Sequence, residues 1–302
     1  MNMDEYFVLF REYMLVQKSS SVNTRDSYLR DVSAFLRYLE GENITSPLEV
    51  ETETVEAYVQ HLHSLNRTNS TISRNIASVR CFYKFLILRG DMQVNPAKSV
   101  KLEKEPKKLP QTLTSEEIDL LLSQPNVTEA KGCRDKAMLE LLYATGIRVS
   151  ELINLNVQDI NLRTGKLFCR GTKGVRTIPI YAKAVVAVSD YLYRMRDLIV
   201  DPDNSGDALF VNLNGSRLTR QGFWKIIKAY TAEAGITKEI TPHTLRHSFA
   251  MHLLQGGASV KDIQTMMGHA DISSTQVYVH LLDLDNHVKS VYNECHPRAK
   301  TS

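Results

Sequence analysis

Apolar side chains recur every three or four positions through the first hundred residues, in four segments separated by short polar stretches. This spacing is that of an α-helix with one buried face. Asn23 is expected to cap the start of the second segment, the third begins after Pro47, and Asn95-Pro96 ends the fourth. The pattern predicts a four-helix N-terminal domain. Its apolar positions are Tyr6, Phe7, Leu9, Phe10, Met14 and Leu15; Tyr28, Val32, Phe35, Leu36 and Leu39; Val55, Tyr58, Val59, Leu62 and Leu65; and Ile72, Ile76, Val79, Phe82, Tyr83, Phe85 and Leu86.

The helical spacing of apolar residues is lost between Asp159 and Ile180, where they lie in short runs separated by glycines. Such runs predict a small antiparallel sheet. Helical spacing flanks this segment on both sides. The expected fold class is therefore two-domain and mainly α, with the four-helix domain followed by a C-terminal α+β domain. Helices of the second domain are expected to start near 114–117 and 148 and to cover about 134–143, 182–198, 220–234, 244–255, 260–267 and 274–281.

The stretch 98–110, KSVKLEKEPKKLP, has two prolines, five lysines and few apolar residues. This composition indicates a linker, so we expect domains at 1–108 and 109–302. Composition alone favours a solvated loop, and the alternative is a strap along a nucleic-acid phosphate backbone. The candidate phosphate contacts are Lys98, Lys101, Lys104, Lys107 and Lys108.

Composition and charge exclude some classes of protein but do not indicate a function. The net charge of +3 neither predicts nor excludes nucleic acid. The four cysteines form no CxxC pair, which argues against a disulfide framework or a cysteine zinc site. The first ten residues carry two acids where a secretion signal needs bases, and no apolar run approaches the length that crosses a membrane. We therefore expect a cytoplasmic protein.

Polar, ionisable residues gather beside apolar helix faces in the second domain. Arg148 follows a glycine turn in ATGIRVSEL, where a salt bridge with Glu151 is the ordinary explanation. His243 and Arg246 lie one helical turn apart, so both can converge on one anion; a capping histidine with a surface arginine is the alternative. Tyr278 lies between two valines, where packing is the commoner role of a tyrosine.

Rival chemistries have little local support. His243 and His247 lie four residues apart, with His252 further on, but the acid of HExxH and a third ligand at standard spacing are missing, so we expect no metal. His269 follows a glycine and is by itself a simple helix cap. The chain has no GxxxxGK[ST] loop, no GxGxxG after a strand and no GxSxG elbow. Nucleotide hydrolysis, dinucleotide binding and esterase chemistry are therefore not indicated.

Taken in order, these segments resemble the tyrosine recombinase (lambda-integrase-like) family, and most closely its Xer branch. The resemblance covers nearly the whole chain. It implies an N-terminal helical core-binding (SAM-like) DNA-binding domain and a C-terminal catalytic domain. The matching text is ATGIRVSELINL, RGTKGVRTIPI, TPHTLRHSFAMHLLQGGASVKDIQTMMGHADISSTQVYVH and HPRA.

The resemblance implies a phosphate clamp built from Arg148 and Arg246. A DNA phosphodiester under attack gains further charge on its non-bridging oxygens. Guanidinium groups stay charged and can bind two oxygens at once, which suits that load.

The resemblance also implies Tyr278 as the nucleophile. A phenol has a pKa near 10 and needs a base or a positive neighbourhood to attack. His243 is the family's candidate base, His269 a hydrogen-bond donor to the phosphate, and Lys173 the acid that protonates the leaving 5′-hydroxyl. None of the six positions is substituted, and no metal, ATP or other cofactor is implied.

The implied activity is site-specific DNA recombination through a 3′-phosphotyrosyl intermediate, of the Xer type that resolves chromosome or plasmid dimers. The implied partners are a double-stranded recombination site and a homo- or hetero-tetrameric synapse with a second recombinase, held partly by residues 282–302. A DNA translocase is a candidate activator. The alternatives are a phage or transposon integrase of the same family, a type IB topoisomerase and a non-catalytic DNA-binding relative.

Overall fold

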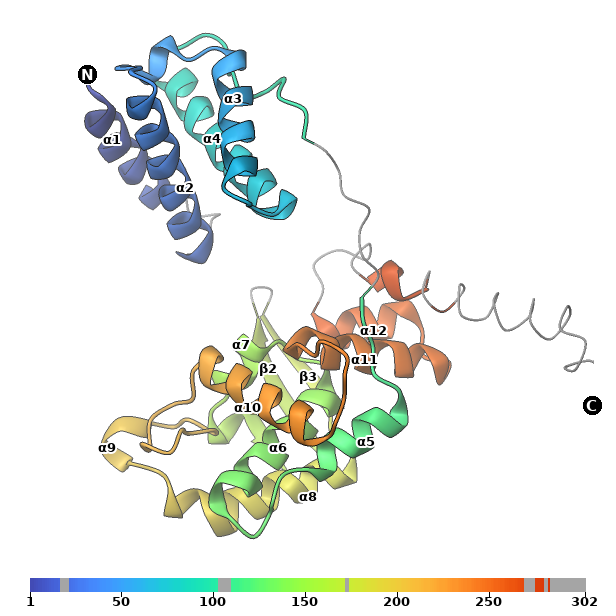
Figure 1. The fold of residues 1–302 in the computed structure, drawn as a ribbon. Helices are drawn as coiled ribbons and strands as arrows, with labels where there is room; N and C mark the ends of the chain where they lie inside the picture. The colour runs from blue at the N-terminus through green and yellow to red at the C-terminus, as the bar shows by residue number, and fades with distance from the viewer. Residues whose placement is uncertain (17–21, 103–109, 172–173, 269–274, 280–281, 283–302) are drawn as a thin grey trace, which may run out of the picture. The chain divides into compact units, whose positions relative to one another are not determined.

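The computed structural model describes residues 1–16, 22–102, 110–171, 174–268, 275–279 and 282. The chain forms two compact units, Met1–Lys107 and Lys108–Ser302, and each is considered by itself. The described residues are mainly helical and contain one three-stranded sheet (Figure 1), so the expected mainly α fold class with a small sheet is confirmed. Among the helices of these ranges, none combines the length and the apolar character needed to cross a membrane.

The first unit is a helical bundle, and the predicted helical segments are confirmed. Its core is rich in aromatic rings, such as Phe10 on Phe82 at 5.3 Å between centroids and Phe35 on Tyr58 at 5.0 Å. The buried carboxylate of Asp31 accepts hydrogen bonds from two residues of the last helix, which ties the second helix to it. The elements are α1 (Met3–Val16), α2 (Val22–Gly41), a 3-10 turn (Pro47–Glu49), α3 (Thr52–Ser64) and α4 (Asn69–Arg89).

The second unit surrounds one long helix, α6, which is buried on nearly every side. A helix that is buried all round has no polar face, so its apolar period carries little information about its ends. This explains why the prediction of 134–143 is too short. The helices of this unit are α5 (Ser115–Ser123), α6 (Ala130–Thr145), α7 (Val149–Ile153), α8 (Ala182–Asp190), α9 (Pro202–Ser205), α10 (Arg220–Glu233), α11 (Pro242–Gln255) and α12 (Val260–Met267).

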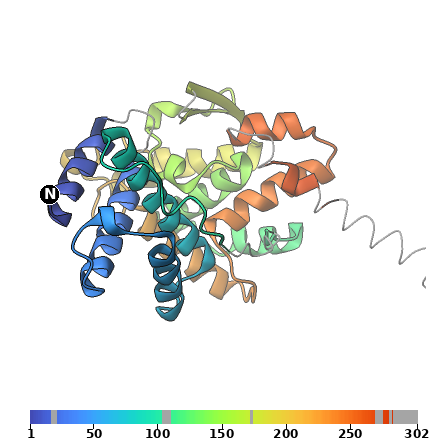
Figure 2. The same cartoon turned by 90° about the horizontal axis from the view of Figure 1, so that it is seen from above.

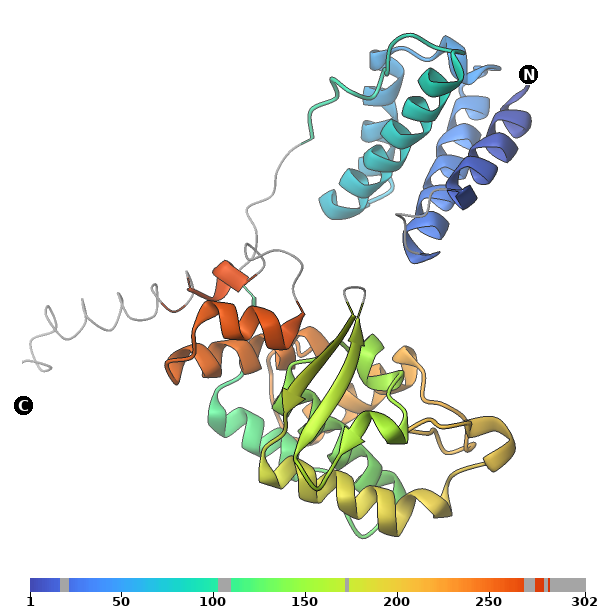
Figure 3. The same ribbon diagram turned by 180° about the vertical axis from the view of Figure 1, so that it is seen from behind.

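The sheet has the strand order β1-β2-β3 and is antiparallel throughout. Its strands are β1 (Ile160–Asn161), β2 (Lys166–Gly171) and β3 (Gly174–Pro179). Leu167, Cys169 and Ile178 are buried on the side that faces the core. Gly171 pairs with Gly174 at the end of the hairpin. Figure 3 views this hairpin with helices packed behind it, and the predicted antiparallel sheet is confirmed.

The helix expected over 182–198 is helical throughout, but it is an α-helix only as far as Asp190. The chain leaves α8 for a π-helical turn (Tyr191–Met195) and then a 3-10 turn (Arg196–Leu198). Tyr191 is fully buried and stacks on Phe210 at 5.6 Å, while Arg196 donates a hydrogen bond to the Ala208 carbonyl at 2.8 Å. These contacts with a distant part of the chain accompany the change from α-helix to π and 3-10 geometry.

Helices α11 and α12 lie together at one end of the second unit, as the orange and red ribbons of Figures 1 and 2 show. They share a small hydrophobic cluster that includes Phe249, Ile263, Met267 and Tyr278. This cluster brings the segment 275–279 against α11, and with it the residues that the sequence singles out for chemistry.

Candidate active site

A sharp turn after α6 presents Arg148. The helix ends at Gly146, whose φ of 58° is left-handed, and a Cβ there would lie 2.2 Å from the Phe249 ring. Only glycine fits both demands. Arg148 then precedes α7 as its N-cap, and its backbone N–H donates to Glu151 Oε2 at 2.7 Å. The turn therefore fixes the backbone of Arg148 beside α11.

The side chain of Arg148 is partly exposed and has two weak partners. One guanidinium nitrogen lies 3.4 Å from Glu151 Oε1 and another lies 3.4 Å from the Gly268 carbonyl oxygen. The salt bridge with Glu151 that the sequence suggests is thus present, with a side chain that is 42% exposed. Both contacts are long, so the guanidinium keeps donor capacity for a further anion.

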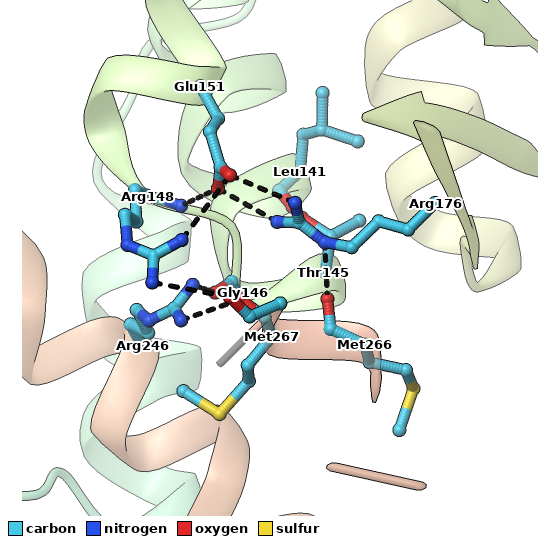
Figure 4. A network of polar contacts seen from close by, with 10 residues as sticks. Leu141, Thr145, Gly146, Arg148, Glu151, Arg176, Arg246, Met266 and Met267 are labelled. Carbon is cyan, nitrogen blue, oxygen red and sulfur yellow. Dashed lines mark hydrogen bonds and ion pairs between the residues drawn. The ribbon is translucent and has the colours of Figure 1, made fainter. Parts of the chain in front are cut away.

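Arg246 is buried deep in the same region. It follows a capped start of α11, where Thr241 accepts from Thr244 N and Pro242 occupies the first turn. Its guanidinium donates to the Gly146 carbonyl and, at 2.7 Å, to the Met267 carbonyl (Figure 4). Burial, together with the positive charge of Arg148, lowers the pKa of Arg246 to about 10, so the group is still charged at neutral pH. Both acceptors are neutral carbonyls, so these bonds supply no counter-charge, and the carboxylate of Glu151 acts on the guanidinium without a direct bond.

Tyr278 is 2% exposed, and its hydroxyl lies 2.6 Å from Nδ1 of His247. Burial raises the pKa of Tyr278, and the charge of Arg246 opposes that rise. Burial, with His243 and Arg246 nearby, lowers the pKa of His247 to about 4. At neutral pH His247 is therefore uncharged, and the His247 tautomer sets which of the two atoms donates in this hydrogen bond.

His243 is exposed and lies one helical turn before His247 on α11, with 6.3 Å between the ring centroids. Burial and the charges of Arg246, Arg220 and Arg148 lower the pKa of His243. It lines a crevice of about 730 Å³ together with Arg148, Arg220, Trp224, Lys225 and Arg246. This crevice is wide and bears several cations, which suits an anionic ligand.

The structure brings together Arg148, His243, Arg246 and Tyr278 of the expected catalytic set. Lys173 and His269 lie outside the described residues, as do Lys104, Lys107 and Lys108. Lys98 and Lys101 are exposed residues of the first unit. Within the ranges that the structure describes, no three His, Cys, Asp or Glu side chains gather closely enough to hold a metal ion.

Sequence reasoning missed two parts of this site. His247 was considered only as a metal ligand, whereas it contacts the Tyr278 hydroxyl. Arg176 lies within the matching segment RGTKGVRTIPI but received no role, whereas it binds Glu151 and the Met266 carbonyl. The place of His247 directly after Arg246 could have indicated that it belongs to the site. For Arg176, the corresponding indication is a basic residue in a strand whose other residues are uncharged.

Comparisons with known proteins agree on one family. Residues 111–284 match the phage integrase family, and residues 7–90 match the N-terminal SAM-like domain of phage integrases. The tyrosine recombinase XerD of Oceanobacillus iheyensis is 44% identical over 293 residues, which are 96% of this chain and 97% of that protein. The XerD of Halalkalibacterium halodurans is 43% identical with the same coverage.

Solved structures extend the comparison to the fold. The XerA recombinase is 29% identical, covers 98% of this chain and 99% of its own, and has a TM-score of 0.53. The XerH recombinase in a post-cleavage complex with a palindromic difH substrate is 19% identical, with a TM-score of 0.75 over 92% of this chain and 82% of its own. At that identity the second likeness shows the fold alone.

Proposed function

Because the chain belongs to the phage integrase family and is a Xer-type tyrosine recombinase, we propose that it resolves chromosome or plasmid dimers with Tyr278 as its nucleophile. The enzyme cuts and rejoins DNA at specific sites. We propose its biological role, the residues that catalyse the reaction and the assembly in which they act.

The contact between Tyr278 and α11 is the observation that carries the proposed catalytic site. The hydroxyl of Tyr278 lies on His247, the residue next to the buried Arg246, and the charge of Arg246 acts on the phenol. A nucleophile beside a buried guanidinium whose hydrogen bonds go to neutral carbonyls is an arrangement suited to attack on an anionic phosphate. Arg148 lies across the Gly146 turn with donors to spare, so a phosphate can be bound from two sides.

We propose the following chemistry for one strand. The Tyr278 oxygen attacks the scissile phosphorus, the bond from phosphorus to the 5′-oxygen breaks, and a 3′-phosphotyrosyl bond forms. The phenol loses its proton and the leaving 5′-oxygen gains one, with Lys173 as the proposed acid. A 5′-hydroxyl of the partner strand then reverses the step. Arg148, Arg246 and His269 are the proposed phosphate ligands, and His243 the proposed base.

The buried position of Tyr278 supports a resting state, in which the nucleophile is not yet placed to attack DNA. An oxygen on a side chain that is 2% exposed cannot reach a phosphate of duplex DNA without movement. We therefore propose that Tyr278 leaves its contact with His247 when the enzyme engages DNA, and that a neighbouring subunit of a tetrameric synapse helps to place it. The XerH recombinase of similar fold was solved with a palindromic difH substrate, which supports a DNA recombination site as the partner. A DNA translocase stays a candidate activator, and the linker lysines stay candidate phosphate contacts.

A two-site plasmid tests the proposed function. Selection from a randomised duplex pool first identifies the DNA site that the protein binds, and two copies of it are placed on one supercoiled plasmid. We expect strand exchange between the copies, seen as four-way junctions or as deletion of the intervening DNA. Relaxation of a one-site plasmid without exchange would instead indicate a topoisomerase, and binding without any cleavage would contradict the enzymatic role.

Acid is expected to destabilise the second unit through His247. Its pKa is about 4 in the folded protein against about 6.5 when free, because of its burial and charged neighbours. Between these values the unfolded chain binds a proton that the folded chain does not, so stability falls as pH drops from about 6.5 to 4. Since the ring is partly exposed, we expect a loss of about 1 kcal/mol.

Denaturant unfolding at pH 6.5 and 4.5 measures this effect. Wild type should lose about 1 kcal/mol more than His247→Gln between these two conditions. The exposed His63, changed to glutamine, serves as a control and should behave as wild type. Equal losses in wild type and His247→Gln would show that His247 does not titrate in this way.

A further inference from the structure

The side chain of Arg176 connects three parts of the catalytic region, because it starts from the sheet and its guanidinium binds two further elements. It lies on β3 and is only 14% exposed, on the same side of the strand as the buried Ile178. Two of its nitrogens donate to the two carboxylate oxygens of Glu151, at 2.9 and 2.8 Å. Its Nε donates to the Met266 carbonyl at 2.9 Å (Figure 4). The side chain thus joins the sheet, α7 and the end of α12.

The hydrogen bonds from Arg176 to Glu151 connect Arg176 indirectly to Arg148, because Glu151 also binds Arg148. Glu151 accepts from Arg176 on one side, and from the Arg148 backbone at 2.7 Å and its guanidinium at 3.4 Å on the other. Burial opposes ionisation of Glu151, but the hydrogen bonds from Arg176 and Arg148 outweigh it and hold the pKa of Glu151 below its ordinary value. The carboxylate is therefore charged and shared between the two arginines.

The hydrogen bond from Arg176 to the Met266 carbonyl lies at the C-terminus of α12. Three successive carbonyl oxygens there each accept from a different arginine: Met266 from Arg176, Met267 from Arg246 and Gly268 from Arg148. A Cβ on Gly268 would lie 2.9 Å from the Arg176 guanidinium carbon, so the group packs directly on this glycine. Arg176 therefore binds the same short segment as Arg148 and Arg246, the two proposed arginine ligands of the phosphate.

We propose that Arg176 is a positioning residue for DNA cleavage. It fixes Arg148 through Glu151, and it fixes the end of α12 against the sheet, so that the phosphate ligands have one geometry before DNA arrives. Arg176 acts through these groups and does not itself touch the DNA. This inference rests on the proposed role of Arg148 as a phosphate ligand.

The ordinary explanation is that Arg176 only stabilises the fold, and Arg134 provides a matched control for it. Arg134 also donates two hydrogen bonds to a carboxylate, that of Asp135, and one to a backbone carbonyl, that of Val211. It is 2% exposed and lies near the start of α6, at the opposite end from the Gly146 turn. Loss of Arg134 should therefore cost stability without disturbing the phosphate ligands.

Single-turnover cleavage of a nicked duplex, at saturating DNA and well below the melting temperature of each variant, separates the two explanations. We expect Arg176→Gln to slow covalent-adduct formation about 10- to 100-fold, because a misplacement near 1 Å has effects of this size. Its affinity for DNA should change by less than about threefold, because the DNA contacts themselves remain. Arg134→Gln should lower the melting temperature at least as much, yet cleave within about threefold of wild type.

A neutral substrate makes the test specific for the phosphate ligands. A methylphosphonate at the cleaved position removes the negative charge that Arg148 neutralises. If Arg176 acts through Arg148, the ratio of wild-type to Arg176→Gln cleavage rates should shrink on this DNA. Should the glutamine variants fail to fold, Arg176→Lys and Arg134→Lys replace them, because lysine keeps the charge but loses the planar fork.

Two results would overturn the proposal: equal cleavage by wild type and the Arg176 variant, or an equal slowing of the Arg176 and Arg134 variants on both DNAs. Failure of wild type to form any adduct would instead contradict the proposed function itself. The two failures are therefore distinguishable.

Discussion

Changing Tyr278 to phenylalanine is expected to abolish strand cleavage while leaving the fold and DNA binding in place. The change removes only the hydroxyl oxygen, and the ring keeps its place in the hydrophobic cluster that it shares with Phe249, Met251 and Met267. The lost hydrogen bond leaves Nδ1 of His247 without its partner, which costs about 1 kcal/mol of stability. Incubation with a nicked duplex followed by a denaturing gel measures the result, and no protein-linked DNA should form.

Tyr143 offers a matched control for this variant. Its hydroxyl also lies on a histidine nitrogen, Nδ1 of His252, at 2.8 Å. Tyr143→Phe therefore loses the same kind of hydrogen bond in the same unit, and it should cleave within about twofold of wild type. Persistent adduct in Tyr278→Phe, or loss of adduct in both variants, would contradict the assignment of the nucleophile.

Changing Arg246 to glutamine is expected to slow cleavage about 10²- to 10³-fold, the usual cost of losing one preorganised donor to a developing negative charge. The guanidinium spans two elements, from the Gly146 carbonyl to the Met267 carbonyl. Lysine lacks the fork that makes both bonds, so Arg246→Lys should restore little. Single-turnover rates of adduct formation on saturating DNA measure the loss.

The control for Arg246 is Arg217, whose guanidinium also donates to two backbone carbonyls, those of Ile153 and Leu155 at the end of α7 and just after it, at 3.0 Å each. Arg217→Gln should cleave within about threefold of wild type when both are compared below their melting temperatures. A similar loss of rate in both variants would mean that Arg246 has only a structural role.

Helices with one buried face could be predicted from the sequence because their apolar period is visible. The segment expected at 260–267 is α12, Val260–Met267, with Ser259 as its cap and a left-handed Gly268 at its end. Two helices were predicted less well. The buried α6 has no polar face, so its apolar period does not mark its first residues, although the left-handed Gly146 sets its end locally. The change from α-helix after Asp190 instead accompanies contacts of Tyr191 and Arg196 with distant residues.

The residue types of the candidate site could be predicted, but their contacts could not. His247 and Tyr278 are 31 positions apart, and Arg176 and Met266 are 90 apart, so only the fold brings them together. Arg148 illustrates a further limit. The sequence offered a salt bridge with Glu151 and a phosphate ligand as alternatives, whereas the structure has the salt bridge in a geometry that leaves donors for a phosphate. Its role as a phosphate ligand stays a proposal.

The most direct test is to identify the residue that becomes linked to DNA. Wild-type protein is trapped on a nicked duplex of its binding site, digested with nuclease and trypsin, and its peptides are analysed by mass spectrometry. We expect peptide 262–289, in which Tyr278 is the one tyrosine, to carry a nucleotide 3′-phosphate on that residue. A nucleotide on any other residue, or no linked peptide from DNA that the protein binds, would contradict the account.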